Sequence, residues 1–334
     1  MKKISQLALG FVFLALVFSS CHNEKKKPVI VQKDTISVFV PDFNSDSAFA
    51  YVKKQVDFGP RTPNSKAQKL CASYFSETLK KYTSNVIVQE FTVKAFDGKM
   101  LQAKNIIASF QPEKTTRIML SSHWDSRPFA DQDPNPDNHK TPIDGANDGA
   151  SGVGILIEIA RLLSLHPSPV GVDIVFFDVE DYGQPNTNDP QKEDTWCLGS
   201  QYWSKNPHKQ GYKANFGILL DMVGAEDATF TQEGISKNFA QDILNKVWRA
   251  AGRAGYGSYF SEQSTGSITD DHYYINEIAK IPTIDIIQHD ATTQSGFYKY
   301  WHTVNDNISN INKNTLRAVG QTLLTVIFEE NTVQ

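Results

Sequence analysis

The chain has 334 residues, of which 40% are hydrophobic and 11% aromatic. This length and composition suit one large globular domain with a substantial core. The formal net charge at pH 7 is −4, and no long basic run lies in the part expected to fold. We therefore expect no nucleic-acid partner, because a groove that binds nucleic acid needs clustered lysines and arginines.

The N-terminal segment is typical of an export signal. Two lysines precede a short apolar stretch over 7–18, which is too short to span a membrane as a helix. The small residues before Cys21 resemble a bacterial lipobox, in which the cysteine carries a lipid; the alternative is an ordinary signal peptide with an incidental cysteine. We interpret 1–21 as a signal peptide and 22–44 as a tether. The protein is expected to be a periplasmic or outer-membrane lipoprotein of a bacterium.

From residue 45 onward, helical and strand patterns alternate without a low-complexity break. In chain order they predict helices over 45–56 and 65–82, strands over 86–93, 101–110 and 117–120, a helix over 149–163, strands over 172–177 and 217–220, a helix over 238–251, a strand over 281–287 and a helix over 315–328. Such alternation indicates a sheet covered on both faces. The predicted fold class is α/β: three α/β/α layers around a mixed, mostly parallel, twisted sheet, in a single catalytic domain over 45–334.

Two cysteines remain beyond the signal segment, Cys71 and Cys197. In an oxidising compartment they could form a disulfide, and buried free thiols are the equal alternative. We assign neither cysteine to the chemistry.

Acids and histidines stand at several of the predicted strand ends and loops. They are His123, Asp148, Glu180, Asp181, Asp221, Asp270 and His302. Ligands collect at the carboxyl ends of parallel strands, so these side chains are expected to share one edge of the sheet. Asp148 alone could be a helix N-cap, and His302 alone could be a surface histidine. A functional site explains the whole set better than separate structural roles do.

The residue types favour zinc. Zinc takes imidazole and carboxylate ligands in a four-coordinate site, with one position open when the site is catalytic. Asp148, Asp181 and His302, from three separate loops, would give that arrangement. No paired-cysteine or HExxH motif competes for the metal, and the scattered acids over 131–137 lack the pattern of a calcium loop.

These motifs resemble those of the zinc-aminopeptidase superfamily, and most closely its glutaminyl cyclase branch. They are HWD at 123–125, GANDGASG at 145–152, FFDVED at 176–181, LLDMVGA at 219–225 and WHTVNDN at 301–307. The resemblance covers nearly the whole chain beyond the signal segment. It implies conversion of N-terminal glutamine to pyroglutamate with release of ammonia.

The resemblance also implies roles for individual residues. Two-zinc aminopeptidases would use His123, Asp148, Asp181, Asp221 and His302, whereas cyclases hold one zinc through Asp148, Asp181 and His302. His123 is then a second-metal candidate or a neighbour of the metal ligands. Glu180 would be the general base, with Asp221 and Asp270 as acids that tune it. Trp301 would contact the substrate.

Trp301, the pair Asp270–Asp271 and the stretch 219–225 are closer to cyclases than to peptidases. There are departures as well: the acidic pair is Glu-Asp instead of two glutamates, and Asp285 stands where animal cyclases have a histidine. The loop 182–196 also differs: it lacks the tryptophan that animal cyclases have shortly after the acidic pair, and we expect Trp196, at the end of the loop, to take over that role.

We therefore expect a monomeric zinc enzyme, with one ion per chain, that acts on peptides and proteins with N-terminal glutamine. The main alternative is an exported two-zinc aminopeptidase. A surface lipoprotein that keeps the fold as a binding module without catalysis is a further alternative, which the intact set of acids disfavours.

Overall fold

The structure is a computed structural model that describes residues 38–185 and 190–330. The predicted signal peptide and most of the predicted tether lie outside the described residues. The end of that tether segment belongs to the folded unit, since Phe43 is buried and its backbone N–H donates to Gln321 Oε1 at 2.9 Å. The side-chain amide of Gln321 in turn donates to the carbonyl of Pro41 at 3.1 Å.

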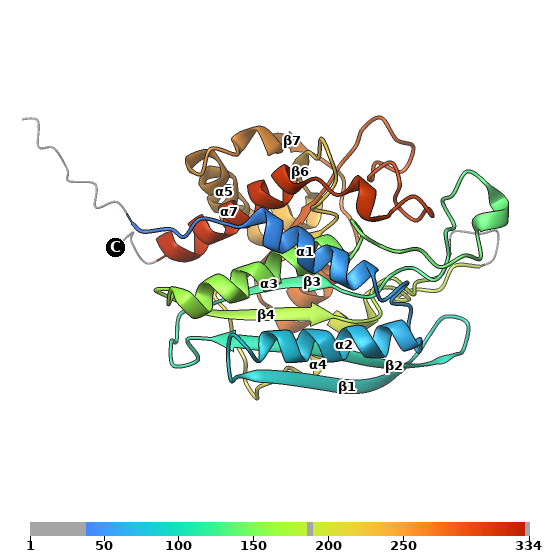
Figure 1. The fold of residues 1–334 in the computed structure, drawn as a ribbon, viewed down its shortest axis with the longest axis horizontal. Helices are drawn as coiled ribbons and strands as arrows, with labels where there is room; N and C mark the ends of the chain where they lie inside the picture. Colours follow the sequence, from blue (N-terminus) through green and yellow to red (C-terminus); the bar gives the residue numbers. More distant parts are fainter. Residues whose placement is uncertain (1–37, 186–189, 331–334) are drawn as a thin grey trace, which may run out of the picture. The chain divides into compact units, whose positions relative to one another are not determined.

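A main sheet of six strands forms the centre of the fold (Figure 1). The strands are β1 (Val86–Lys94), β2 (Met100–Phe110), β3 (Arg117–His123), β4 (Gly171–Phe177), β5 (Phe216–Asp221) and β8 (Thr283–Ile287), in the spatial order β1-β2-β4-β3-β5-β8. The pairs β1–β2 and β2–β4 are antiparallel, and the strands from β4 to β8 run parallel. The predicted mixed, mostly parallel sheet is confirmed.

Helices cover both faces of this sheet. The largest core cluster combines one face with α1 (Ser45–Val56), α2 (Lys66–Leu79), α3 (Ala150–Leu165), α5 (Gly234–Arg253) and α7 (Lys313–Glu329). On the other face, α4 (Leu198–Lys205) places Trp203 against Ile107 and Met119. The short α6 (Asp271–Tyr274) and a π-helical turn, η3 (Ile275–Ala279), lie next to α4. Neighbouring residues of one strand, such as Ile106 and Ile107, therefore enter different cores.

Some elements differ from the sequence prediction. The helix expected from 238 begins earlier, because the Glu233 side chain accepts hydrogen bonds from the N–H groups of Ile235 and Ser236 and caps α5. The helix α4 was not predicted; it follows Cys197, which has a left-handed backbone and forms no side-chain cap, so the usual start signal is missing.

The structure adds several short elements beyond the main sheet. A small parallel pair joins β6 (Phe230–Gln232) to β7 (Phe260–Ser264). Three short 3₁₀ turns are η1 (Pro136–Asn138), η2 (Gly257–Tyr259) and η4 (Ile308–Asn310). These segments are too short to produce a clear periodic pattern in the sequence.

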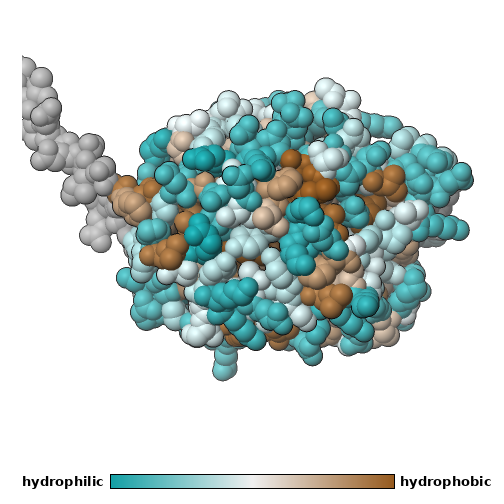
Figure 2. All heavy atoms as spheres, viewed as in Figure 1, coloured by the Kyte–Doolittle hydropathy of each residue, from teal (hydrophilic) through white to brown (hydrophobic). Residues whose placement is uncertain are grey.

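Within 38–185 and 190–330, none of the helices has the length and apolarity needed to cross a membrane. The face of the molecule in Figure 2 is mainly hydrophilic, with smaller hydrophobic areas between polar groups.

Packing of residues 38–44 on α7 leads to a stability prediction. A Cβ at Gly320 would lie within 3.0 Å of the Phe43 ring, whereas a Cβ at Gly252, in α5, would meet no atom within 4 Å. We expect Gly320→Ala to lower the free energy of unfolding by about 1–3 kcal/mol through overpacking. Gly252→Ala should leave it unchanged or raise it by up to about 1 kcal/mol. Denaturant unfolding measures the change in the free energy of unfolding for both variants. Equal changes would show that the packing of Phe43 against Gly320 does not contribute to stability.

Candidate metal and catalytic site

The side chains at the predicted strand ends converge on one cavity at the carboxyl edge of the main sheet. His123 and Asp221 end β3 and β5, and Glu180 and Asp181 follow β4. The cavity has a volume of about 990 Å³, and its lining includes Asp148, Glu180, Asp181, Trp196, Asp221, Asp270, Trp301 and His302. All eight were singled out in the sequence. His123, the ninth, is buried beside Asp148 and Asp221.

The three predicted metal ligands lie close together. Asp148, Asp181 and His302 offer ligand atoms that are all within 4.8 Å of one another. Nε2 of His302 lies 3.1 Å from Oδ1 of Asp181 and 3.7 Å from Oδ2 of Asp148. Two ligand atoms of a tetrahedral zinc ion are about 3.3 Å apart, since each stands about 2.0 Å from the metal. The spacing of these atoms therefore fits zinc.

The environment of Asp181 also fits a cation. Its side chain is 1% exposed, and among the described residues neither carboxylate oxygen has a hydrogen-bond partner. Arg127 approaches no closer than an Nη1–Oδ1 distance of 3.8 Å. Burial and then the charge of Asp148 raise the pKa of Asp181 to about 6. A buried carboxylate without donors is costly unless a positive charge compensates it, so a metal ion suits this position.

A second carboxylate orients the imidazole of His302. Oδ1 of Asp131 lies 3.3 Å from His302 Nδ1, and Arg127 holds Asp131 through two contacts of 3.0 and 2.9 Å. A carboxylate at this position favours the proton on Nδ1, which leaves Nε2 free to bind a metal. Sequence reasoning missed this role, because the acids over 131–137 were considered only as a calcium loop.

Two further buried aspartates hold the backbone of the ligand segments. Asp125 accepts hydrogen bonds from the N–H groups of Glu180 and Asp181 at 3.0 and 3.1 Å. Asp306 does the same for Asn147 and Asp148 at 2.8 and 3.0 Å. Asp125 and Asp306 both lie within motifs of the sequence. A motif alone does not show which carboxylate would bind a metal ion and which accepts hydrogen bonds from backbone N–H groups.

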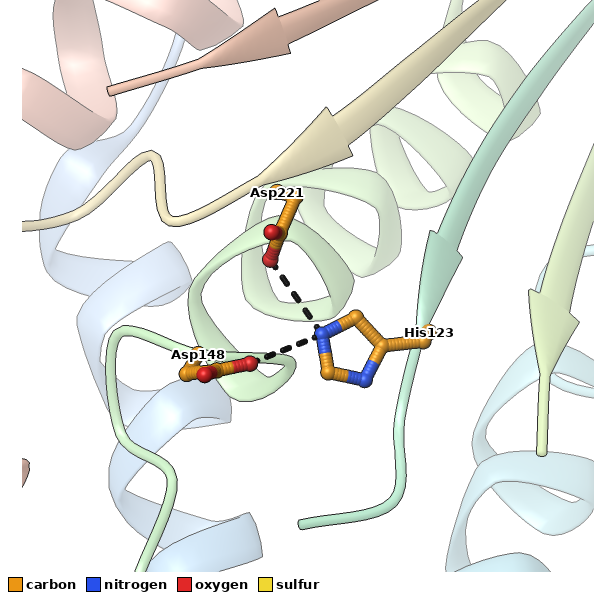
Figure 3. Close-up of side chains that lie close together, drawn as sticks. All are labelled: His123, Asp148 and Asp221. Carbon is orange, nitrogen blue, oxygen red and sulfur yellow. Dashed lines mark hydrogen bonds and ion pairs between the residues drawn. The ribbon is translucent and has the colours of Figure 1, made fainter. Parts of the chain in front are cut away.

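His123 joins Asp148 and Asp221 in a second buried cluster (Figure 3). Its Nε2 lies 3.0 Å from Oδ1 of Asp148 and 3.2 Å from Oδ1 of Asp221. These are the ligands that a second zinc would require, so this geometry is compatible with a two-metal site as well. The alternative role of Asp148 as a helix cap is wrong, because Gly149 occupies the N-cap position of α3 and no side chain caps it.

Glu180 faces the cavity among other acids. Burial raises its pKa well above the usual value; the charge of His123 partly offsets this, and those of Asp270 and Asp181 add to it. Burial also raises the pKa of Asp221 to about 7, although the hydrogen bond with His123 lowers it. Carboxyl groups that share a buried site cannot all ionise, so some of this cluster is protonated near neutral pH.

A buried polar chain extends behind Asp270. Asp285, on β8, is fully buried, and burial together with the charge of Asp270 raises its pKa well above the usual value. His272 lies between two acids: its Nδ1 is 4.0 Å from Oδ2 of Asp285, and its Nε2 is 3.0 Å from Oε2 of Glu233. Polar atoms of Asp270, His272 and Asp285 all lie within 4.8 Å of one another, so Asp285 stands next to one of the acids assigned to the site from the sequence.

Two tryptophans of the cavity lining lie near His302. The Trp301 and His302 rings are 3.8 Å apart at 26°, and the Trp196 and His302 rings are 5.9 Å apart at 7°. The guanidinium of Arg127 lies 4.4 Å from the Trp196 ring. The sequence prediction placed both tryptophans at the substrate, and both line the cavity.

Left-handed backbone conformations are concentrated at this site. Val179, Cys197, Met222 and His302 all have φ between 47° and 57°. Such values are uncommon for residues other than glycine and cost free energy, so the surrounding hydrogen bonds must hold them.

Both cysteines of the described chain are buried and free. The disulfide alternative between Cys71 and Cys197 is therefore wrong in this structure. Cys197 nevertheless reaches the site, because its thiol lies 3.0 Å from Oε1 of Glu180. Nothing in the sequence pattern indicated this contact.

The fold and the site agree with a known protein family. The profile of Peptidase family M28 matches residues 105–327, which include all the predicted metal ligands. The chain belongs to peptidase family M28.

Solved structures similar to this chain include two glutaminyl cyclases and one exopeptidase. The Bacteroides thetaiotaomicron glutaminyl cyclase, bound to N-acetylhistamine, is 54% identical, with a TM-score of 0.86 over 88% of this chain and 100% of that one. The Tannerella forsythia glutaminyl cyclase is 53% identical, with a TM-score of 0.86 over 87% and 100%. A Zn-dependent exopeptidase from Parabacteroides distasonis is 52% identical, with a TM-score of 0.86 over 87% and 99%.

A more distant relative is the aminopeptidase YwaD of Bacillus subtilis. It is 24% identical over 92% of this chain, and the chain spans 63% of the length of that protein.

The contact between Asp131 and His302 leads to a prediction about metal affinity. We expect Asp131→Asn to weaken zinc binding about 10- to 100-fold, because the imidazole loses the carboxylate that orients it. Asp137→Asn, an exposed acid of the same loop, is the matched control and should bind zinc like the unaltered protein. Zinc retained against a competing chelator gives the affinities without any activity assay. Equal zinc retention by the two variants would rule out this role of Asp131.

Proposed function

We propose that this protein is a glutaminyl-peptide cyclotransferase, which converts N-terminal glutamine of peptides and proteins to pyroglutamate and releases ammonia. The observation that carries the proposal is 54% identity to the Bacteroides thetaiotaomicron glutaminyl cyclase over 88% of the chain. The arrangement of Trp301 and Asp270 in the cavity lining supports it further.

We propose that one zinc ion is held by Asp148, Asp181 and His302, whose spacing and burial fit it. When bound, zinc acts as a Lewis acid that polarises the γ-carbonyl oxygen of the substrate glutamine. The nucleophile is the α-amine of the substrate itself, which forms a bond to the carbon of the side-chain carboxamide (Cδ) while the bond from that carbon to the amide nitrogen breaks.

Side chains of the cavity accept and donate the protons that move in this reaction. Glu180 takes a proton from the attacking amine and delivers it to the leaving nitrogen, which departs as ammonia. Asp221 and Asp270 share the remaining protons of the cluster and hydrogen-bond the amide group. Trp301 packs against the glutamine side chain, and Trp196 contributes to the cavity wall near His302.

The predicted export signal adds a cellular context. We propose that the protein is exported, is anchored through a lipid on Cys21 and acts as a monomer. Its substrates would then be exported peptides and proteins that begin with glutamine.

A two-zinc aminopeptidase is the second candidate. The cluster of His123, Asp148 and Asp221 favours it, since it could take a second ion. The similarity to an exopeptidase at 52% identity points the same way.

The reaction product separates these two functions. With the zinc-loaded protein and a peptide that begins with glutamine, we expect one ammonia per peptide and a product lighter by one ammonia, with every residue retained. Mass spectrometry and an ammonia assay measure this. Release of free amino acid from a peptide that begins with leucine, without ammonia from the glutamine peptide, would instead identify an aminopeptidase.

The role of Glu180 is tested by substitution. We expect Glu180→Gln to lower kcat at least about 100-fold while zinc stays bound, because the amide cannot accept the proton. Glu193→Gln, an exposed acid at the cavity wall, is the control and should keep normal turnover. Near-normal turnover of the Glu180 variant would show that another group is the base.

A further inference from the structure

Cys197 lies directly against the proposed base. Its side chain is fully buried, and Sγ lies 3.0 Å from Oε1 of Glu180. The backbone N–H of Cys197 also donates to the carbonyl of Glu180 at 2.9 Å. The two residues are therefore joined twice, once through the main chain and once through the side chains.

The local backbone fixes the thiol in this place. Cys197 has a left-handed conformation, with φ of 57°, immediately before α4. The next N–H, that of Leu198, donates to the carbonyl of Val179 at 3.1 Å. On the other side, Asp125 accepts from the N–H of Glu180. The thiol and the carboxylate consequently sit on two segments that several hydrogen bonds hold together.

The thiol supplies a donor where the surroundings are otherwise acidic. Glu180, Cys197 and Asp270 place their polar atoms within 4.8 Å of one another. Within 38–185 and 190–330, the thiol is the side-chain donor that hydrogen-bonds the carboxylate of Glu180. Burial and then the charge of Glu180 raise the pKa of Cys197 well above its usual value, so the S–H remains a donor at neutral pH.

We propose that Cys197 is a positioning residue for Glu180: its S–H holds Oε1 of the carboxylate, so that Oε2 is presented to the α-amine of the substrate. This inference rests on the proposed function. Cys197 is not among the residues that line the cavity and is none of the three proposed metal ligands, so it would act through the orientation of Glu180 alone. An unheld carboxylate among other acids would turn away from the geometry that proton transfer requires.

The test compares Cys197→Ala, which removes the donor, with Cys197→Ser, which keeps a donor on a shorter arm. Cyclisation of a glutamine peptide is measured per zinc-loaded protein. We expect Cys197→Ala to lower kcat about tenfold with KM changed less than twofold, and Cys197→Ser to recover most of the loss. Cys71→Ala is the matched control, because Cys71 is also a buried free thiol but lies on α2; its kcat should be normal.

A double-mutant cycle separates positioning from a general effect on stability. In a Glu180→Gln background, Cys197→Ala should cause no further loss of kcat, because the group that it positions is already disabled. The inference is overturned if Cys197→Ala keeps normal kcat, if KM alone changes, if Cys197→Ser recovers nothing, or if the loss persists in that background. Failure of the unaltered protein to release ammonia would instead overturn the proposed function.

Discussion

The structure depends above all on the compensation of buried negative charge. One cavity at the carboxyl ends of the parallel strands is lined by Asp148, Glu180, Asp181, Asp221 and Asp270. Carboxylates in such a place must be paired with a cation, hydrogen-bonded or protonated, because burial disfavours an isolated charge. All three solutions occur here, and each corresponds to a different chemical task. The proposed zinc compensates Asp148 and Asp181, backbone N–H groups serve Asp125 and Asp306, and the acids around Glu180 share protons.

This division explains why the site needs so much surrounding structure. The proposed zinc ligand Asp181 must keep its oxygens free of hydrogen-bond donors, so its backbone is fixed through Asp125 instead. His302 is similarly fixed from behind by Asp131 and Arg127. The left-handed residues Val179 and Cys197 let the segments around Glu180 turn toward the cavity, and the hydrogen bonds between those segments offset the conformational cost.

The sequence predicted the main elements of the fold and the residues that gather at the cavity. That success has a physical reason: β4 and β5 are buried throughout and apolar apart from Asp173 and the final Asp221, so their bounds are clear. Polar residues at the ends of such strands have few structural explanations. The start of α5 was placed too late, because Glu233 caps the helix from outside the periodic pattern. The helix α4 was missed, because a left-handed cysteine precedes it.

The supporting contacts were beyond sequence reasoning. Asp131 reaches His302 across more than 170 residues, and Cys197 reaches Glu180 only because α4 returns to the end of β4. The number of metal ions also depends on how side chains from distant segments are placed, since the ligands of one zinc and of two zincs are all present in the sequence.

Anomalous X-ray scattering at the zinc absorption edge, from crystals grown with zinc, is the most direct test of a single zinc ion. We expect one peak per chain, bounded by Asp148, Asp181 and His302. A second peak of similar height between His123 and Asp221 would contradict it.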